Sequence, residues 1–243
     1  MGRGPSIEGR KNAEDARRGK LFTKLIREIT IAARQGPDPA SNARLRVGIE
    51  KAKAVSMPSD TIERALKRAS GADAADMHEL RYEGYGPAGV ALIIDCMTDN
   101  QQRTVADVRS ALTKHGGNLG TSGSVAFQFK RVGELVFATP DAVSEEKVLE
   151  VALEAGADDV QAADSGSDRG QSTVLCAPEA YEAVKKALVA AKLEPTRADI
   201  VWRPENRIKV EGEAEETLLD LLDRLEDLDD VQEVYHNAAL SEA

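Results

Sequence analysis

Beyond Gly71 the hydrophobic pattern alternates between strand-like and helix-like segments, and this order limits the possible folds more than any other feature of the chain. One complete set, in the order strand, helix, strand, strand, helix, strand, is expected at 134–138, 144–155, 158–163, 173–176, 178–191 and 198–202. This order is typical of a ferredoxin-like α/β domain, which we place at residues 133–202.

A strand–helix–strand set precedes this domain, and another follows it. The leading set is expected at 90–97, 101–114 and 124–130, and the trailing set at 207–210, 213–227 and 231–236. In the strand expected at 124–130, Val125, Phe127 and Phe129 are spaced as on the inward face of a strand. We expect the two outer sets to pair into a second, split ferredoxin-like domain at 76–132 plus 203–243.

The first 75 residues have helical spacing instead. In the helix expected from Asn12 to Arg34, an apolar face covers about 140° of the helical wheel, and it consists of Leu21, Phe22, Leu25, Ile26 and Ile29. A separate arc of about 80°, on roughly the opposite side, carries cations, and these are Arg17, Lys20, Lys24 and Arg27. Two shorter helices, each preceded by a proline-containing turn, complete a small bundle.

The sequence therefore predicts an α+β protein. A basic N-terminal three-helix domain at 1–75 is followed by two ferredoxin-like α/β domains, one inserted in the other.

The charge is divided unevenly along the chain. The whole chain carries 32 Lys and Arg against 42 Asp and Glu, but residues 1–70 carry 16 against 8 and have a net charge of +8. A basic module on an acidic body favours a polyanionic partner, although a solvated helical face explains the same pattern. Charge alone leaves both interpretations open. The candidate phosphate contacts are Arg17, Arg18, Lys20, Lys24, Arg27, Arg44, Arg46, Lys51, Lys53, Lys67 and Arg68.

The residue patterns of catalysis and metal binding are absent from the sequence. His78, His115 and His236 have no ligand spacing to one another or to a cysteine, and no Ser-His-Asp arrangement can be nominated. We attribute the many carboxylates between Glu213 and Asp230 to favourable charge at a helix N-terminus and to solubility. We therefore expect no enzyme activity, no metal and no cofactor.

The glycine-rich stretch from His115 to Ser124 lacks the Gly-Lys-Ser/Thr ending of a phosphate loop, and it follows a helix instead of preceding one. We interpret it as a helix stop followed by turns. The alternative, in which its backbone amides contact a partner's phosphate, stays open.

Localisation signals are also missing. No stretch approaches the ~20 consecutive apolar residues of a membrane span, and the first residues contain no apolar segment of a secretory signal. Cys96 and Cys176 lie in apolar runs, as is typical of buried reduced thiols. We expect a cytoplasmic protein with no membrane partner, and the sequence leaves its oligomeric state, monomer or weak dimer, open.

Several motifs together resemble the YebC/PmpR family. In the helical region they are the run 18–29, Asn42-x-Arg44-Leu45-Arg46, Lys51-Ala52-Lys53-Ala54 and Met57-Pro58-x-Asp60. Further on they are Tyr82-Glu83-Gly84-Tyr85-Gly86-Pro87, Thr98-Asp99-Asn100, Arg103-Thr104 and Gly116-Gly117-x-Leu119-Gly120-x-x-Gly123-Ser124-Val125. The match is dense through about residue 131 and weaker across the inserted domain.

The resemblance implies a basic helical domain, two α/β domains, a cytoplasmic location and DNA binding as a transcriptional regulator. Other members of the family, including mitochondrial relatives, act in translation at the ribosome and ease the synthesis of proline-rich stretches. Both activities would place a basic surface on nucleic-acid phosphates.

We therefore expect a cytoplasmic, DNA-binding transcriptional regulator that contacts phosphates through its basic helices. The alternative is a ribosome-associated translation factor that binds ribosomal RNA and relieves stalling at proline-rich stretches. Gln and Asn are scarce on the basic helices, so contacts to the backbone should dominate over base reading. Recognition of RNA shape needs no base-reading helix, which suits the alternative somewhat better.

Overall fold

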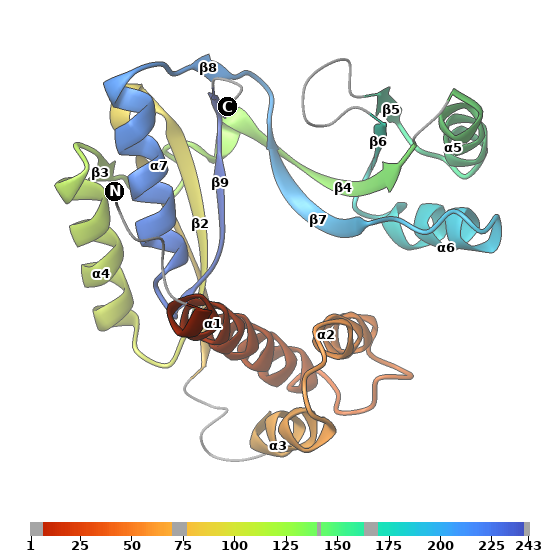
Figure 1. Ribbon diagram of the computed structural model, residues 1–243, viewed down its shortest axis with the longest axis horizontal. Helices are drawn as coiled ribbons and strands as arrows, with labels where there is room; N and C mark the ends of the chain where they lie inside the picture. Colours follow the sequence, from red (N-terminus) through yellow and green to blue (C-terminus); the bar gives the residue numbers. More distant parts are fainter. Residues whose placement is uncertain (1–6, 70–76, 140–141, 163–169, 241–243) are drawn as a thin grey trace. The chain divides into compact units, whose positions relative to one another are not determined.

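The computed structural model describes residues 7–69, 77–139, 142–162 and 170–240, and it divides into two compact units (Figure 1). The first unit is formed by Met1–Val125 with Glu211–His236, and the second by Ala126–Val210 with Asn237–Ala243. The α+β class, with a helical N-terminal region before two regions built on sheets, is confirmed. We retain 1–75, 76–132 plus 203–243, and 133–202 as the proposed domain limits.

The N-terminal region contains α1 (Ile7–Ala33), α2 (Ala43–Ala54) and α3 (Ser59–Ala69). Asn42 joins the first two helices. Its side-chain oxygen accepts from the Leu45 amide at 3.0 Å and caps α2, while its side-chain amide donates to the carbonyls of Ala32 and Gly36. One side chain therefore closes α1 and opens α2, which packs back against α1.

The helical spacing of α1 identifies most of the core side of this helix: Leu25 and Ile29 are buried, Phe22 and Ile26 are partly buried, but Leu21 is 41% exposed. The buried side chains come from all three helices, and they include Leu25, Ile29, Leu45, Ile62 and Ala65.

The rest of the first unit is an antiparallel sheet with two helices. The strands are β1 (His78–Tyr85), β2 (Ala91–Thr98), β3 (Asn118–Leu119) and β9 (Val231–His236), in the order β3-β1-β2-β9. The helices α4 (Gln101–Lys114) and α7 (Glu213–Glu226) lie side by side over the sheet (Figure 1). Segments before and after the inserted domain thus meet in one sheet, because β9 pairs with β2.

The second unit has the ferredoxin-like order. Its elements are β4 (Phe129–Ala138), α5 (Ala142–Glu154), β5 (Asp159–Ala162), β6 (Gln171–Cys176), α6 (Tyr181–Ala190) and β7 (Arg197–Pro204). The sheet order is β5-β6-β4-β7, with all pairs antiparallel. Both helices pack on a core that contains Leu135, Phe137, Val174, Val184 and Leu188.

The strand expected at 124–130 is wrong over 124–128, and only its last two residues lie in β4. Ala126–Gln128 forms a 3₁₀ turn, the Phe127 side chain is 72% exposed, and β4 begins only at Phe129. The reason is that the Val125 amide donates at 2.8 Å to the Glu83 carboxylate, so it is not available to a strand ladder.

Two further details of the strand assignment differ from expectation. No strand is expected at 78–85, but β1 pairs with β2 along all its residues. The split sheet therefore has the order β3-β1-β2-β9, which is not the ferredoxin-like strand order. The strand expected at 207–210 is reduced to β8 (Ile208–Lys209), which pairs with β10 (Ala238–Ala239) and not with the sheet of the first unit.

None of the helices in the described part of the chain has an apolar stretch of the length that a membrane span requires.

Close backbone approach at Gly117 generates a stability prediction. A Cβ at this position would lie 2.3 Å from the Tyr85 carbonyl oxygen and 3.3 Å from that of Leu112. Gly117→Ala should therefore push α4 and β1 apart and lower the free energy of unfolding by about 1–3 kcal/mol, measured by urea denaturation with far-UV circular dichroism. Gly19→Ala is the control, since nothing lies within 4 Å of its Cβ, and on helix propensity it should stabilise α1 by about 0.5–1 kcal/mol. Equal stability of Gly117→Ala and the wild type would contradict the packing argument.

Candidate nucleic-acid interface

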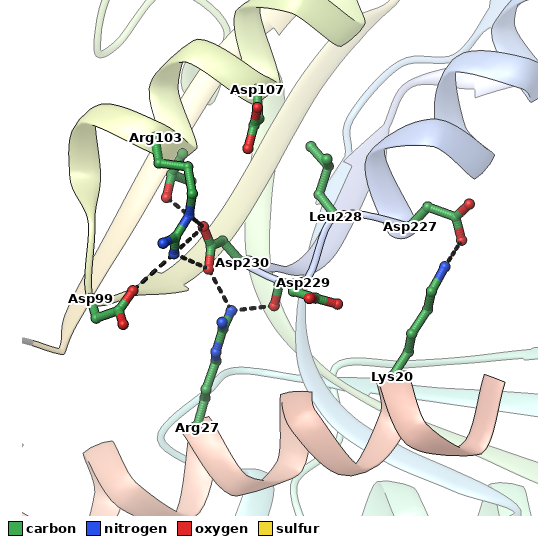
Figure 2. Close-up of a pocket in the computed structure, with 10 residues that line it drawn as sticks. Lys20, Arg27, Asp99, Arg103, Asp107, Asp227, Leu228, Asp229 and Asp230 are labelled. Atoms are coloured by element: carbon green, nitrogen blue, oxygen red, sulfur yellow. Dashed lines mark hydrogen bonds and ion pairs between the residues drawn. The ribbon is translucent and has the colours of Figure 1, made fainter. Parts of the chain in front are cut away.

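The cationic face of α1 meets an acidic turn of the same unit (Figure 2). This acidic turn, Asp227 to Asp230, follows α7 and leads into β9. The Lys20 Nζ lies 2.5 Å from an Asp227 carboxylate oxygen, and the Arg27 Nη1 lies 2.7 Å from one of Asp230. Two of the four cations predicted to face a partner are therefore paired with the chain's own carboxylates.

Arg27 is a buried anchor for α1. Its side chain is only 15% exposed, and its Nη1 also donates to the carbonyl of Met97 at 3.1 Å and to that of Asp229. These acceptors lie in β2 and in the acidic turn. The guanidinium therefore ties the helical region to the sheet of the same unit.

Asp230 is the acceptor at the centre of this junction. Its side chain is 7% exposed and also accepts from the Arg103 Nε at 3.1 Å, the Arg103 Nη2 at 2.9 Å and the Thr104 hydroxyl at 2.9 Å. A buried carboxylate is stable only when it is paired and hydrogen-bonded, and here two guanidinium groups and a hydroxyl satisfy it. The assignment of Asp230 to solubility is therefore wrong, because its partners lie far away in the sequence.

Two exposed carboxylates at the rim of the junction are also paired. The hydrogen bond from Lys20 holds the pKa of Asp227 below its ordinary value, and the hydrogen bond from Arg103 does the same for Asp99. Both carboxylates stay charged at neutral pH, so both pairs are intact there. Being exposed, they contribute little stability.

On α2, Arg44 is paired as well. Its guanidinium donates to the Glu79 carboxylate at the start of β1, and this hydrogen bond raises the pKa of Arg44. Lys51 and Lys67 each take part in an interaction within the chain.

The other predicted contacts form no hydrogen bond or ion pair with a carboxylate among the described residues. We call them the uncommitted cations, and they are Arg17, Arg18, Lys24, Arg46, Lys53 and Arg68. All except Lys24 are exposed, and the Lys24 side chain is partly exposed. Arg46 donates only to the Pro39 carbonyl, at 3.2 Å.

One contact links part of this set across the helical region. The Arg18 guanidinium lies over the Phe22 ring, 5.4 Å from its centroid, and contacts the Ser56 carbonyl at 3.5 Å. This contact joins the middle of α1 to the α2–α3 connection, three residues beyond Lys53. We take Arg17, Arg18 and Lys53 as the candidate group for contact with a phosphate chain.

The glycine-rich loop between α4 and β4 already holds an anion of its own. The buried Glu83 carboxylate accepts from the amides of Gly123 and Val125, both at 2.8 Å, and the Glu83 carbonyl accepts from Gly120 at 2.8 Å. The interpretation of this segment as turns is supported. The alternative, in which these amides contact a partner's phosphate, is not supported, because the amides already donate to Glu83.

The junction also encloses a hollow of about 610 Å³ lined by α1, α4 and the acidic turn (Figure 2). Its lining is almost entirely charged, and Leu228 is its one aliphatic side chain. Among the described residues, no group of three or more His, Cys, Asp or Glu side chains is arranged to hold a metal ion. The ion pairs in this lining join α1 and α4 to the acidic turn.

Sequence reasoning missed Arg103, Thr104 and Asp230 as a unit. Arg103 and Thr104 belong to a motif quoted above, and Asn100 in the same stretch caps α4 by accepting from the Arg103 amide at 3.0 Å. The motif gave a signal for the two α4 residues but none for their acceptor, since Asp230 lies 127 positions from Arg103.

Comparison with known proteins covers nearly the whole chain. The TACO1/YebC protein N-terminal domain matches residues 4–72, and the TACO1/YebC second and third domain matches residues 77–238. A probable transcriptional regulatory protein of Stenotrophomonas maltophilia is 57% identical over 242 residues, which is 99% of this chain and 98% of the relative. One of Xanthomonas oryzae is 55% identical over 98% of this chain and 97% of its own length.

A solved structure is also similar. The crystal structure of a conserved hypothetical protein of Aquifex aeolicus matches with a TM-score of 0.82 and 42% identity, over 94% of this chain and 93% of the other.

The buried pair at Asp230 predicts that the stability of the first unit depends on this carboxylate. Asp230→Asn leaves the buried Arg27 without its counter-charge, and it should destabilise the first unit by about 3 kcal/mol. Trp202, the one tryptophan of the chain, lies on β7 of the second unit. In urea denaturation, the transition followed by far-UV circular dichroism should therefore have a lower midpoint concentration. The midpoint of the transition followed by Trp202 fluorescence should stay unchanged.

The control is Asp229→Asn, whose exposed carboxylate has no cationic partner among the described residues. It should leave both transitions unchanged. An Asp230→Asn protein as stable as this control would show that the buried pair does not hold the unit together.

Proposed function

The chain belongs to the TACO1/YebC family, and on that premise we propose that it is a DNA-binding transcriptional regulator whose uncommitted cations hold nucleic-acid phosphates. Its relatives in Stenotrophomonas and Xanthomonas are named probable transcriptional regulatory proteins. The observation that carries the proposal is the set of uncommitted cations, concentrated on the helical region of an otherwise acidic chain. The proposed setting is the cytoplasm, and no catalytic role is assigned.

Electrostatics limits where a polyanion can bind. The chain has a net charge of −10, so it repels nucleic acid over most of its surface. Only a local concentration of cations can overcome this repulsion within the Debye length of about 10 Å at 0.1 M salt. The group around Arg17, Arg18 and Lys53 provides such a surface. If all six uncommitted cations contact phosphates, log K on duplex DNA falls against log salt with a slope of about −5.

Few side chains of the helical region are suited to reading bases. Direct readout of adenine relies on Asn or Gln, and guanine on Arg or Lys held in the major groove. Asn42 is fully engaged in joining α1 to α2. The proposed contacts are therefore mainly to the backbone, and sequence preference should be modest.

This observation also favours the second candidate, a ribosome-associated translation factor that binds ribosomal RNA and relieves stalling at proline-rich stretches. Folded RNA is recognised mostly through shape and phosphate contacts, which the same cations could make without reading bases.

The first prediction concerns affinity. The triple substitution Arg17→Gln, Arg18→Gln and Lys53→Gln should weaken binding to duplex DNA and reduce the magnitude of the salt slope by about 0.9 per lost contact. Fluorescence anisotropy at several salt concentrations measures both quantities. The fold should be unaffected, because all three side chains are exposed.

A matched control removes three exposed lysines from α4, α5 and α6. Lys114→Gln, Lys147→Gln and Lys186→Gln change the net charge equally but lie outside the helical region. If both triple variants weaken binding to the same extent, the contact is a general effect of charge and the proposed surface is wrong.

A second prediction separates the two partners. Sucrose-gradient fractionation of a cell lysate should leave the protein outside the ribosomal fractions if it regulates transcription, and promoter fragments should then outcompete random DNA. Co-sedimentation with ribosomes that resists high salt, combined with equal affinity for promoter and random DNA, would replace the first function by the second.

A further inference from the structure

The acidic turn contacts Lys20 and Arg27, two of the cations that are predicted from the sequence to bind phosphates. Lys20 and Arg27 are seven residues apart on α1, which is about 10.5 Å along the helix axis. Both are met by this one turn, through the carboxylates of Asp227 and Asp230 and the carbonyl of Asp229. The turn therefore presents acceptors to α1 where a nucleic-acid backbone would present phosphate oxygens.

The contacts differ in how easily they can be broken. The Asp230 pair is buried, with side chains 7% and 15% exposed, and it holds the turn in place. The Lys20 pair is open to solvent, with side chains 41% and 60% exposed. An exposed pair is weak and screened by salt, so an external phosphate can compete for Lys20 without disturbing the buried pair.

Two further charges lie at the same place. The Asp229 carboxylate is exposed, lines the hollow beside Lys20, and has no cationic partner among the described residues. Lys24, one turn beyond Lys20, helps to lower the pKa of Asp227 and so lies within electrostatic reach of the turn. A phosphate that approaches Lys20 would therefore meet the negative charges of Asp227 and Asp229 at the same place.

We propose that the acidic turn is an autoinhibitory element: Asp227 and Asp229 shield Lys20 from nucleic acid, and a bound phosphate chain displaces Asp227 from Lys20. This inference rests on the proposed nucleic-acid binding, which it deepens by adding a regulated part of the surface. The uncommitted cations away from the turn make the first contact, and Lys20 joins only after its own carboxylate has been displaced.

Charge removal from the turn tests the proposal. The variant Asp227→Asn with Asp229→Asn is compared with Asp220→Asn and Asp223→Asn, two exposed carboxylates of α7 that do not line the hollow. The probe is a random-sequence DNA duplex, and affinity is measured at several salt concentrations. The released Lys20 should steepen the salt slope by about 0.9, which corresponds to about eightfold tighter binding at 0.1 M salt. The control variant should gain much less.

The same substitutions in a Lys20→Gln background identify the released group. The gain should shrink there, because Lys20 is no longer available to be released. A gain that is equal in the turn variant and the α7 control would overturn the inference and leave the proposed function standing. Absence of binding by the wild type and by every variant, with DNA and with ribosomal RNA, would overturn both.

A chemical readout follows the displacement in the unmodified protein. A carbodiimide joins an amine and a carboxylate in direct contact as an amide, and Lys20 and Asp227 meet this condition at 2.5 Å. Mass spectrometry should detect this cross-link in the free protein, and a saturating duplex should reduce its yield several-fold. An unchanged yield with duplex bound would show that Lys20 stays paired.

Discussion

The buried carboxylate of Asp230 is the interaction on which the first unit depends. It is bound by Arg27 of α1 and by Arg103 and Thr104 of α4, and it follows directly on the turn that ends α7. Three segments far apart in the sequence are thereby fixed to one small group of atoms. Removing a charge from water is costly, so such an arrangement persists only when every partner is in place. The orientation of α1, and of the cations it carries, follows from this requirement.

The same junction divides the basic residues into two groups. Lys20, Arg27 and Arg44 are paired with carboxylates of the same unit, whereas Arg17, Arg18 and Lys53 point to no carboxylate of the described chain. A polyanion that binds this protein therefore meets a smaller basic surface than the charge count of the first 70 residues suggests. The acidic character of the whole chain would confine such binding to that surface.

Most elements of the fold could be predicted, because hydrophobic periodicity is a local property. The helix expected at 101–114 and the strand expected at 231–236 have the limits expected for them. The strand β1 was missed, although Leu80 and Tyr82 alternate with charged residues as in a half-buried strand, and it pairs with β2 along its whole length. The start of the segment 124–130 was assigned wrongly because Glu83, some forty positions earlier, accepts the backbone amide of Val125.

The sequence by itself determined the α+β class, the order of helical and sheet regions, and the concentration of positive charge at the start of the chain. These follow from residue type and spacing, which need no knowledge of distant neighbours. Only the tertiary structure decided which cations remain available, because pairing depends on which carboxylate folds to within hydrogen-bond distance. Lys20 and Lys24 lie on one face of one helix, yet only Lys20 has Asp227 at 2.5 Å.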